Sequence, residues 1–282
     1  MCEMSFYFEK GNFVLKTTRV AHIESNGTLV FRNKMNSILF PVNFTSRDYD
    51  IFFTICWYAK QLGYSDSRNY IEMPYSKISQ FFAEGLNKTR FNNEVLEFCK
   101  KVLGENGSAI YKSLEITNND EIMTAGVFFI SIKAFRNTQI LKFKLNTEAL
   151  DILFGTLKFM RINLHDFISI RSKFAKSLYR LLLQYQNIRS DKDGFKCVNF
   201  NRPDFERFMS VPEKYETRDL DRRVINPAIE ELNENYFKKI VLEKKIAEGS
   251  KKNVIGYSFR FMLNEDAWFC LELRSLLLIL II

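Results

Sequence analysis

The chain has 282 residues, of which 46% are hydrophobic, which suits one large or two small domains with their own cores and excludes a disordered chain. Lysine and arginine number 41 against 33 aspartates and glutamates, and the net charge of +8 favours polyanions such as nucleic acid or an acidic membrane surface. Five scattered cysteines without CxxC spacing argue against a disulfide framework or a zinc finger and indicate a reducing, cytoplasmic location.

Both ends of the chain differ from the rest. Residues 1–35 form an N-terminal segment without a basic stretch followed by an apolar one, so no signal peptide is predicted. Residues 265–282 form an apolar tail ending in LLLILII, which is too short to span a bilayer, and no membrane partner is expected. Three explanations of the tail stay open: it covers the second domain, it covers a partner, or it reflects only the end of the reading frame.

The first half of the chain carries three helical patterns and one strand pair. Apolar residues recur at helical spacing after Thr45, a capping residue, and β-branched and aromatic residues flank a polar turn at Arg136. The predicted elements are a helix (45–63), a short helix (74–85), a helix capped by Thr89 (87–104) and a β-hairpin (125–146).

The second half repeats this order. Its predicted elements are a helix (172–186), a short helix from Pro203, a helix (218–234) and two strands (238–247 and 253–261) joined by a turn at Gly249. Helix, short helix, helix and hairpin is the winged-helix order, so we expect an α+β fold of two tandem winged-helix domains. Residues 36–155 are expected to form the first domain, with possible dimerisation and DNA contacts, and residues 156–264 the second, the main sequence-specific DNA-binding domain.

The helix RDLDRRVINPAIEELNE begins basic and ends acidic. At about 100° per residue, Arg222, Arg223 and Asn226 lie opposite the apolar arc that contains Leu220. A recognition helix enters the major groove with its N-terminal residues, where arginine pairs with guanine and asparagine with adenine. Pro227 predicts either a kink or a new helical segment capped by Asn226.

Basic residues next to this helix extend the expected DNA-binding surface. Thr217 is a candidate N-cap that also reaches a phosphate, and the hairpin tip carries two lysines. In the second domain the predicted DNA-binding residues are Lys214, Thr217, Arg218, Arg222, Arg223, Asn226, Lys251 and Lys252. In the first domain they are Lys88, Arg90, Asn93 and Arg136, for which dimerisation or packing fits nearly as well. A merely solvated charged face is the alternative for each helix.

No catalytic motif accompanies these elements. His22 and His165 lie far apart and do not form a metal-binding pair, and no GxxxxGK[ST] is present to hold a triphosphate. The acidic pairs Asp48/Asp50 and Asp219/Asp221 fit first-turn charges better than a metal site. We therefore expect no enzymatic activity, no cofactor and no metal.

A family resemblance adds to this interpretation. SKFAKSLYRLLLQYQ, SVPEKY, TRDLDRRVINPAIEELNE and KKNVIGYSFRF, in this order between about Leu157 and Met262, resemble the Rep_3 family of plasmid replication initiators, and FTSRDYDIFFTI resembles the family's N-terminal winged helix. The resemblance implies binding to directly repeated sequences, the iterons, in double-stranded origin DNA. It places the recognition helix at Thr217–Asn226 and the wing at Lys251 and Lys252.

The same resemblance implies partners. Members act as monomers in initiation and as dimers that repress their own gene or restrain copy number, and they open the origin and recruit the replicative helicase together with host factors, including the host replication initiator. Two alternatives stay open: a tandem winged-helix transcriptional repressor without initiator activity, and a protein-interaction module that does not bind specific DNA.

Overall fold

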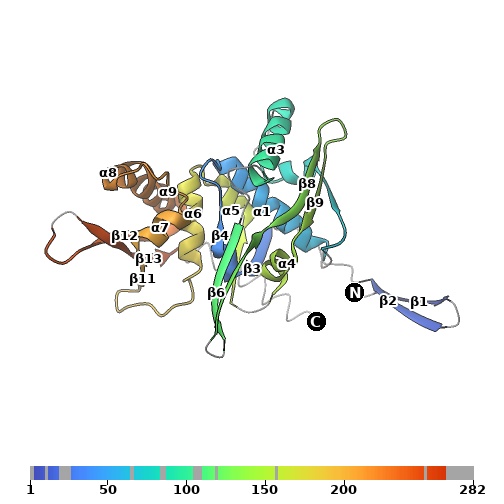
Figure 1. Cartoon of the computed structure of the whole chain (residues 1–282), viewed down its shortest axis with the longest axis horizontal. Coiled ribbons are helices and arrows are strands. Elements are labelled where there is room, and N and C mark those ends of the chain that lie inside the picture. The colour runs from blue at the N-terminus through green and yellow to red at the C-terminus, as the bar shows by residue number, and fades with distance from the viewer. Residues whose placement is uncertain are drawn as a thin grey trace.

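Two copies of one arrangement, each with helices on a three-stranded antiparallel sheet, make up most of the structure, a computed structural model (Figure 1). The structure describes residues 3–9, 12–18, 27–63, 67–82, 87–103, 110–117, 120–155, 158–250 and 253–264. Each copy is a winged helix, and the expected α+β fold of two tandem winged-helix domains is confirmed.

The first winged helix is built around α1 (Ser46–Gln61), which is buried along most of its length. Thr45 and Asp48 start this helix with reciprocal hydrogen bonds, each side chain accepting from the other residue's amide. The other elements of this copy are β5 (Ile71–Pro74), α2 (Tyr75–Ser79), α3 (Lys88–Leu103), β8 (Phe129–Phe135) and β9 (Ile140–Leu145). Asn87 caps α3 in place of the expected Thr89, because its side chain accepts from the Arg90 amide at 2.9 Å while Thr89 lies inside the helix.

The second winged helix begins with α6 (Lys173–Leu183), which Ser172 caps. Its other elements are β11 (Lys196–Asn201), α7 (Arg202–Phe208), α8 (Thr217–Leu220), the π-helix η2 (Asp221–Ile225), α9 (Asn226–Asn235), β12 (Phe237–Ile246) and β13 (Val254–Leu263). The buried residues Tyr257, Phe259 and Phe261 turn one face of β13 toward the core.

The two sheets have the same topology. The strand between the first and second helices pairs with the last strand of the hairpin, which gives the orders β5-β9-β8 and β11-β13-β12. The sequence pattern did not reveal β5 or β11, because strands of 4 and 6 residues carry little periodicity.

The remaining elements lie outside the two winged-helix copies. They are β1 (Glu3–Glu9), β2 (Asn12–Thr18), β3 (Thr28–Arg32), the 3₁₀ helix η1 (Asn33–Ser37), β4 (Ile38–Leu39), β6 (Ile110–Thr117), β7 (Asp120–Val127), α4 (Thr147–Phe154), β10 (Phe159–Asn163) and α5 (Leu164–Ser169). Strand β10 pairs antiparallel with β3, so hydrogen bonds cross the expected boundary between residues 155 and 156. The exact division of the chain stays a prediction.

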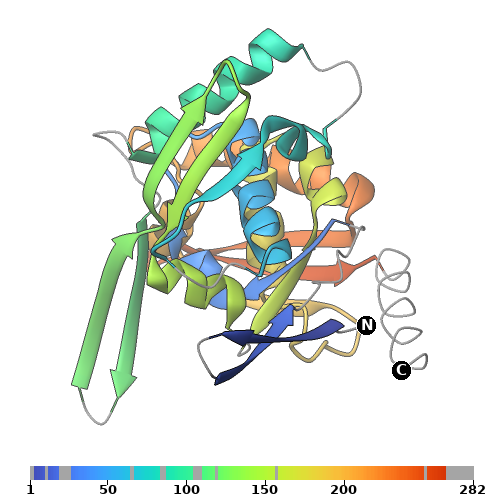
Figure 2. The same ribbon diagram turned by 90° about the vertical axis from the view of Figure 1, so that its right-hand side faces the viewer.

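Helix α6 lies between the two winged helices, where it contacts α1 of the first copy and α9 of the second. Residues from Ala175 to Leu183 are all buried, although Lys176, Ser177 and Arg180 among them are polar or charged. In the turned view of Figure 2, the β5-β9-β8 sheet stands in front of α1, on the side away from the second copy.

Candidate nucleic-acid interface

The helical segment from α8 to α9 has a buried apolar face and an exposed basic face. Leu220, Val224 and Ile225 are buried against the core, with η2 and α9 both contacting α6. Arg222, Arg223 and Asn226 are exposed, as the helical periodicity predicted, and Arg218 is exposed beside them. The basic groups therefore project from the first half of the segment, which is the end that a recognition helix places in the major groove.

Pro227 was expected either to kink the helix or to begin a new segment capped by Asn226, and the structure shows a third arrangement, a π turn. The backbone stays helical through Ile225 and Asn226, but the Asn226 amide donates to the Asp221 carbonyl, a π-type bond. The wider π turn precedes Pro227, which lies in the first turn of α9, where its missing N–H is least costly. Asn226 therefore does not cap α9, and its side chain is exposed on the basic face.

The arginines of this face differ in their partners. Arg223 Nε lies 3.2 Å from Asp219 Oδ1, one turn earlier, and its guanidinium lies 5.5 Å from the centre of the Tyr215 ring. Within the residues that the structure describes, Arg218 and Arg222 have no ion-pair partner. These two side chains are the ones available to an external acceptor without breaking an existing bond.

Thr217 is held by the preceding helix. Its hydroxyl accepts a 2.8 Å hydrogen bond from Arg202 Nη1, and Arg202 Nε also lies 2.5 Å from Glu206 Oε1. Glu216, whose side chain makes no capping bond, occupies the N-cap of α8, so the expectation that Thr217 caps the helix is wrong. The Thr217 hydroxyl keeps its own proton for donation to a phosphate. Lys214 is exposed in the loop between α7 and α8.

The wing of the second copy is the β12–β13 hairpin. Lys244 Nζ lies 2.5 Å from Asp221 Oδ2, which connects the wing to the π-helix η2. Lys245 is exposed on the same strand. Lys251 and Lys252, the expected wing contacts, lie outside the described residues.

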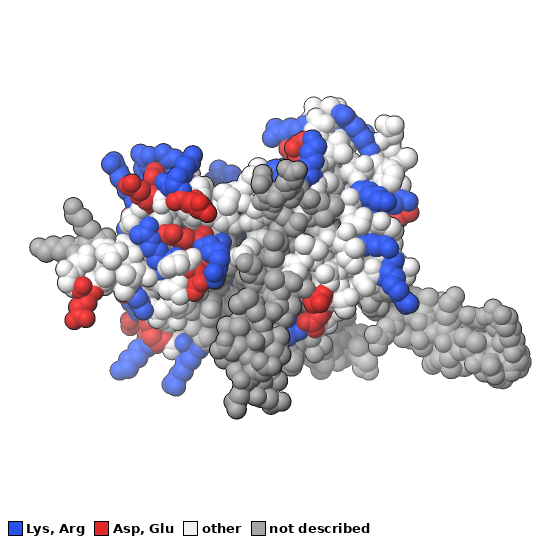
Figure 3. Space-filling view, in the orientation of Figure 1, with Lys and Arg blue, Asp and Glu red and all other residues white. Residues whose placement is uncertain are grey.

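The first winged helix presents a weaker version of the same surface. Lys88, Arg90 and Asn93 are exposed along the first half of α3, and Arg136 is exposed at the turn between β8 and β9. In Figure 1, α3, α8 and the β8–β9 turn all lie along the upper edge, and in Figure 3 lysine and arginine side chains gather along this edge over both modules. The basic ends of both helices thus face the same side of the molecule.

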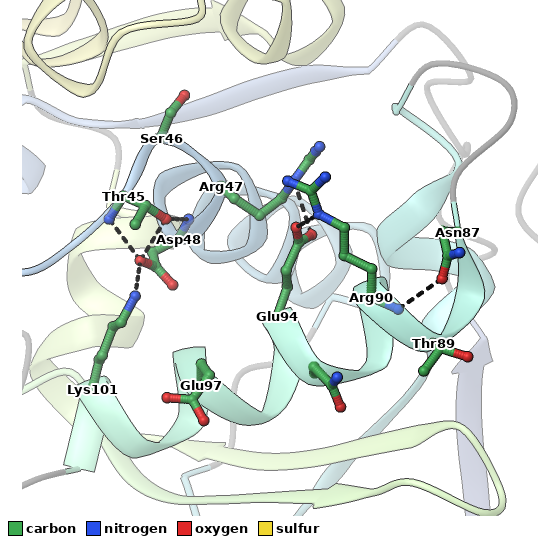
Figure 4. Close-up of a pocket in the computed structure, with 11 residues that line it drawn as sticks. Thr45, Ser46, Arg47, Asp48, Asn87, Thr89, Arg90, Glu94, Glu97 and Lys101 are labelled. Carbon is green, nitrogen blue, oxygen red and sulfur yellow. Dashed lines mark hydrogen bonds and ion pairs between the residues drawn. The ribbon is translucent and has the colours of Figure 1, made fainter.

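Acidic side chains pair with some of the basic residues of the first winged helix. Glu94 accepts from Arg90 Nε at 3.0 Å and lies 3.3 Å from Arg47 Nε, in a groove between α3 and the start of α1 (Figure 4). Lys101 Nζ lies 2.7 Å from Asp48 Oδ2 at the other end of this groove. One exposed arginine on each surface, Arg90 here and Arg223 in the second copy, therefore already has a carboxylate partner.

Buried charges join the two modules. Lys176 of α6 lies 2.7 Å from Asp50 of α1 and also donates to the Phe167 carbonyl. Burial raises the pKa of Asp50 to about 6, although the charge of Lys176 opposes the rise, and burial lowers the pKa of Lys176. Asp50 is thus not a first-turn charge that merely favours a helix N-terminus.

Arg180, one turn along α6, is also buried. Its Nη2 donates to Asn36 at 2.9 Å, and its guanidinium lies about 5 Å from the rings of Phe40, Phe53 and Phe208, the last from the second copy. Burial lowers the pKa of Arg180 to about 10, which leaves it charged at neutral pH. Ser210 adds a 2.9 Å hydrogen bond from the second copy to the Phe40 carbonyl. Sequence patterns did not indicate these interactions, because charged residues on an amphipathic helix are normally exposed.

Two negative findings concern only the described part of the chain. It contains no group of three or more histidine, cysteine, aspartate or glutamate side chains that could hold a metal ion. None of its helices is long and apolar enough to cross a membrane.

Comparisons with known proteins agree with this architecture. A family model for the initiator replication protein, WH1, matches residues 28–183, and one for the initiator Rep protein, WH2, matches residues 202–261. Among curated proteins, no sequence matches this one. The crystal structure of the Pi initiator protein in complex with iteron DNA is similar, with a TM-score of 0.57 and 13% identity over 85% of this chain and 98% of that chain. Domains 2 and 3 of RctB give a TM-score of 0.43 and 10% identity over 93% of this chain and 90% of that chain.

Proposed function

Because the chain belongs to the initiator Rep protein family, we propose that it is a plasmid replication initiator that binds iteron repeats in double-stranded origin DNA. The observation that carries the proposal is the placement of two basic helix ends, on α3 and α8, along one side of the molecule. A single duplex lying across this side meets both winged helices. The similar Pi initiator protein was solved in complex with iteron DNA, which supports the same ligand here.

In the second winged helix, the exposed basic face enters the major groove. Arg218 and Arg222 reach guanine edges, and Asn226 reaches an adenine edge, because these side chains match the donor and acceptor patterns of those bases. Arg223 stays oriented by Asp219 and Tyr215. Lys214 and Thr217 bind the flanking phosphates, with Lys251 and Lys252 as the wing's contribution.

In the first winged helix, Lys88, Arg90, Asn93 and Arg136 contact an adjacent groove and backbone. Glu94 competes with DNA for Arg90, as Asp219 competes for Arg223 in the second module. Since only phosphate and base contacts are involved, recognition requires no catalytic residue from this chain. Strand opening is completed with host factors, including the host replication initiator and the replicative helicase, and a dimer of the chain represses its own gene.

The experiment is fluorescence anisotropy with duplex repeats from beside the gene and with the same bases shuffled, at two salt concentrations. A preference of ~10³ or more for the repeats is expected for a specific binder. An origin-bearing plasmid that replicates when the chain is supplied in trans then separates an initiator from a repressor. Equal affinity for both duplexes would contradict iteron recognition, and failure to bind either would favour a protein-interaction module.

A further inference from the structure

An acidic side chain lies in the basic half of the continuous helical run from α8 through η2 to α9, which is called the α8–α9 segment below. Asp221 is the first residue of η2 and directly precedes the exposed Arg222. A free carboxylate at this place would repel the phosphates of any duplex bound there and lower its affinity. The carboxylate of Asp221 is not free, however, because it is paired with the wing.

The wing holds Asp221 through Lys244 of β12. Lys244 Nζ lies 2.5 Å from Asp221 Oδ2, and the two side chains are 34% and 26% exposed. Asp221 Oδ1 is buried, and no group in the described part of the chain donates a hydrogen bond to it. Removing Lys244 would therefore leave a partly buried carboxylate without its partner and would favour its movement toward water. Such a movement would displace η2, because Asp221 begins that turn.

A second contact connects the same strand to the other end of the α8–α9 segment. The Asn233 side chain of α9 accepts a 2.7 Å hydrogen bond from the Ile240 amide of β12. Lys244 lies four residues further along this strand. The strand therefore fixes the segment at two points, one in η2 and one in α9. With both points held, the segment cannot rotate about its own axis without breaking one of these contacts.

We propose that Asp221 and Lys244 are positioning residues, through which the wing directs Arg222 toward its base. The ion pair holds η2 against β12, and Arg222 follows Asp221 in the chain. If the pair is broken, η2 shifts and turns the Arg222 guanidinium away from the base edge, while Asn233 keeps α9 in place. Loss of the pair therefore lowers base preference rather than general affinity. This inference deepens the proposed function and rests on it, because it concerns which repeat the second winged helix selects.

The test measures a specificity ratio with the full chain: the affinity for duplex repeats from beside the gene, divided by the affinity for the same bases shuffled. Lys244→Met should lower this ratio by about 5- to 150-fold, the range for one lost base contact. Asp221→Asn should lower it as well, while the shuffled duplex binds more tightly because a negative charge is gone. The double variant should lower the ratio no further than either single variant, since all three remove the same ion pair. Lys244→Arg keeps the cation and should keep the parent ratio.

Lys245→Met is the matched control for charge. Lys245 is exposed, and it follows Lys244 on β12, so its side chain lies on the opposite face of the strand. Removing this charge should change binding to the repeats and to the shuffled duplex by the same factor, which leaves the specificity ratio unchanged. Circular dichroism checks that each variant is folded.

A second measurement needs no DNA. The Asn226 amide donates to the Asp221 carbonyl and closes the π turn. In hydrogen exchange followed by nuclear magnetic resonance, Lys244→Met should speed the exchange of this amide about fivefold, as expected for the loss of a partly exposed ion pair that holds the turn. Lys245→Met should leave its exchange rate unchanged.

Two results of the titrations would overturn the proposal. Lys244→Met would either keep the parent specificity ratio or lose affinity for both duplexes equally, and in the second case Lys244 would be a simple phosphate contact. A parent chain without preference for the repeats would instead contradict the proposed function. Unchanged exchange of the Asn226 amide in Lys244→Met would show that the ion pair does not hold η2, whatever DNA the parent binds, so the two failures give different results.

Discussion

Lys176 Nζ of α6 lies 2.7 Å from Asp50 Oδ1 of α1, and both side chains are buried at the junction between the two winged helices. Removing one partner of a buried ion pair leaves an uncompensated charge away from water. This junction also contains Arg180, so most of the charge of α6 is turned inward rather than toward solvent.

Replacing Lys176 by Met leaves Asp50 buried without its partner and should therefore lower the free energy of unfolding at pH 7 by about 3–5 kcal/mol, as measured by urea denaturation. The double replacement Asp50→Asn with Lys176→Met should recover part of this loss, because neither of the two positions then carries a charge. Asp151→Asn, which removes an exposed partner of Arg32, is the matched control and should change stability by less than about 1 kcal/mol. A single variant as stable as the parent would show that the pair contributes nothing.

The same carboxyl predicts a pH dependence. Its pKa rises from 3.8 to about 6 on folding, so the folded chain holds this proton more tightly than the unfolded chain. The stabilisation from this group is therefore complete below pH 3.8 and is lost as the pH rises through about 6. The free energy of unfolding of the parent, relative to Asp50→Asn, should fall by roughly 3 kcal/mol between pH 4 and 7. A constant difference across this range would contradict the raised pKa.

Arg222→Ala should weaken binding to the repeats by ~1–3 kcal/mol and relax the preference at one base position. The exposed side chain has no ion-pair partner among the described residues, so its loss should leave the thermal midpoint unchanged. Arg161→Ala, at an exposed position on β10, removes the same positive charge elsewhere and serves as the control. Anisotropy with a set of single-base variants of the repeat measures both effects, and an unaltered base preference would remove Arg222 from direct readout.

Glu94→Gln should strengthen binding to every duplex, with a steeper salt dependence, because Arg47 and Arg90 lose a competing carboxylate. The expected gain is about 3- to 10-fold, corresponding to one added phosphate contact of ~1 kcal/mol. Glu148→Gln neutralises an exposed carboxylate at the start of α4 and should have no such effect. If Glu94→Gln and Glu148→Gln bind alike, the first winged helix does not contact the duplex through Arg90.

Pro227→Ala tests the π turn. Alanine supplies the N–H that proline lacks, so a regular α-helix becomes available in place of η2. Removing the extra residue of the π turn would rotate Arg222 relative to α9, and affinity for the repeats should fall although helix stability rises. Nuclear magnetic resonance shifts of Asp221–Asn226, recorded beside the binding titrations, report whether the turn has changed. Unchanged shifts with weakened binding would point to another cause.

Helical periodicity predicted much of this structure because it depends on local sequence. The helices around Thr45, Ser172 and Pro203 were placed within a few residues, and the exposed face with Arg222 and Asn226 was identified correctly. The residues that start a helix were less predictable. Asn87 and Glu216 occupy the N-cap positions expected at Thr89 and Thr217. The Asn87 side chain supplies a capping hydrogen bond, whereas the Glu216 side chain makes none.

Contacts between distant segments could not be predicted. No local pattern pairs Asp50 with Lys176, places Arg180 between three aromatic rings, or brings Tyr70 beside Lys133 and Lys144. Ile255 alternates with the buried Tyr257, Phe259 and Phe261 along the sequence but is 49% exposed, while Val254 is buried, because a bulge near Lys245 shifts the register. These interactions depend on how the two modules and their sheets meet.

The inward charges of α6 also limit how the modules can move. A helix packed through apolar side chains alone can slide by small steps, since each intermediate position loses little packing free energy. Lys176 and Arg180 have fixed hydrogen-bond partners, so a small rotation of one module against the other would break these bonds before new ones form. Rearrangement of this junction should therefore occur as a jump between discrete states. Within one such state, a duplex bound across both modules would contact two winged helices held at a fixed distance from each other.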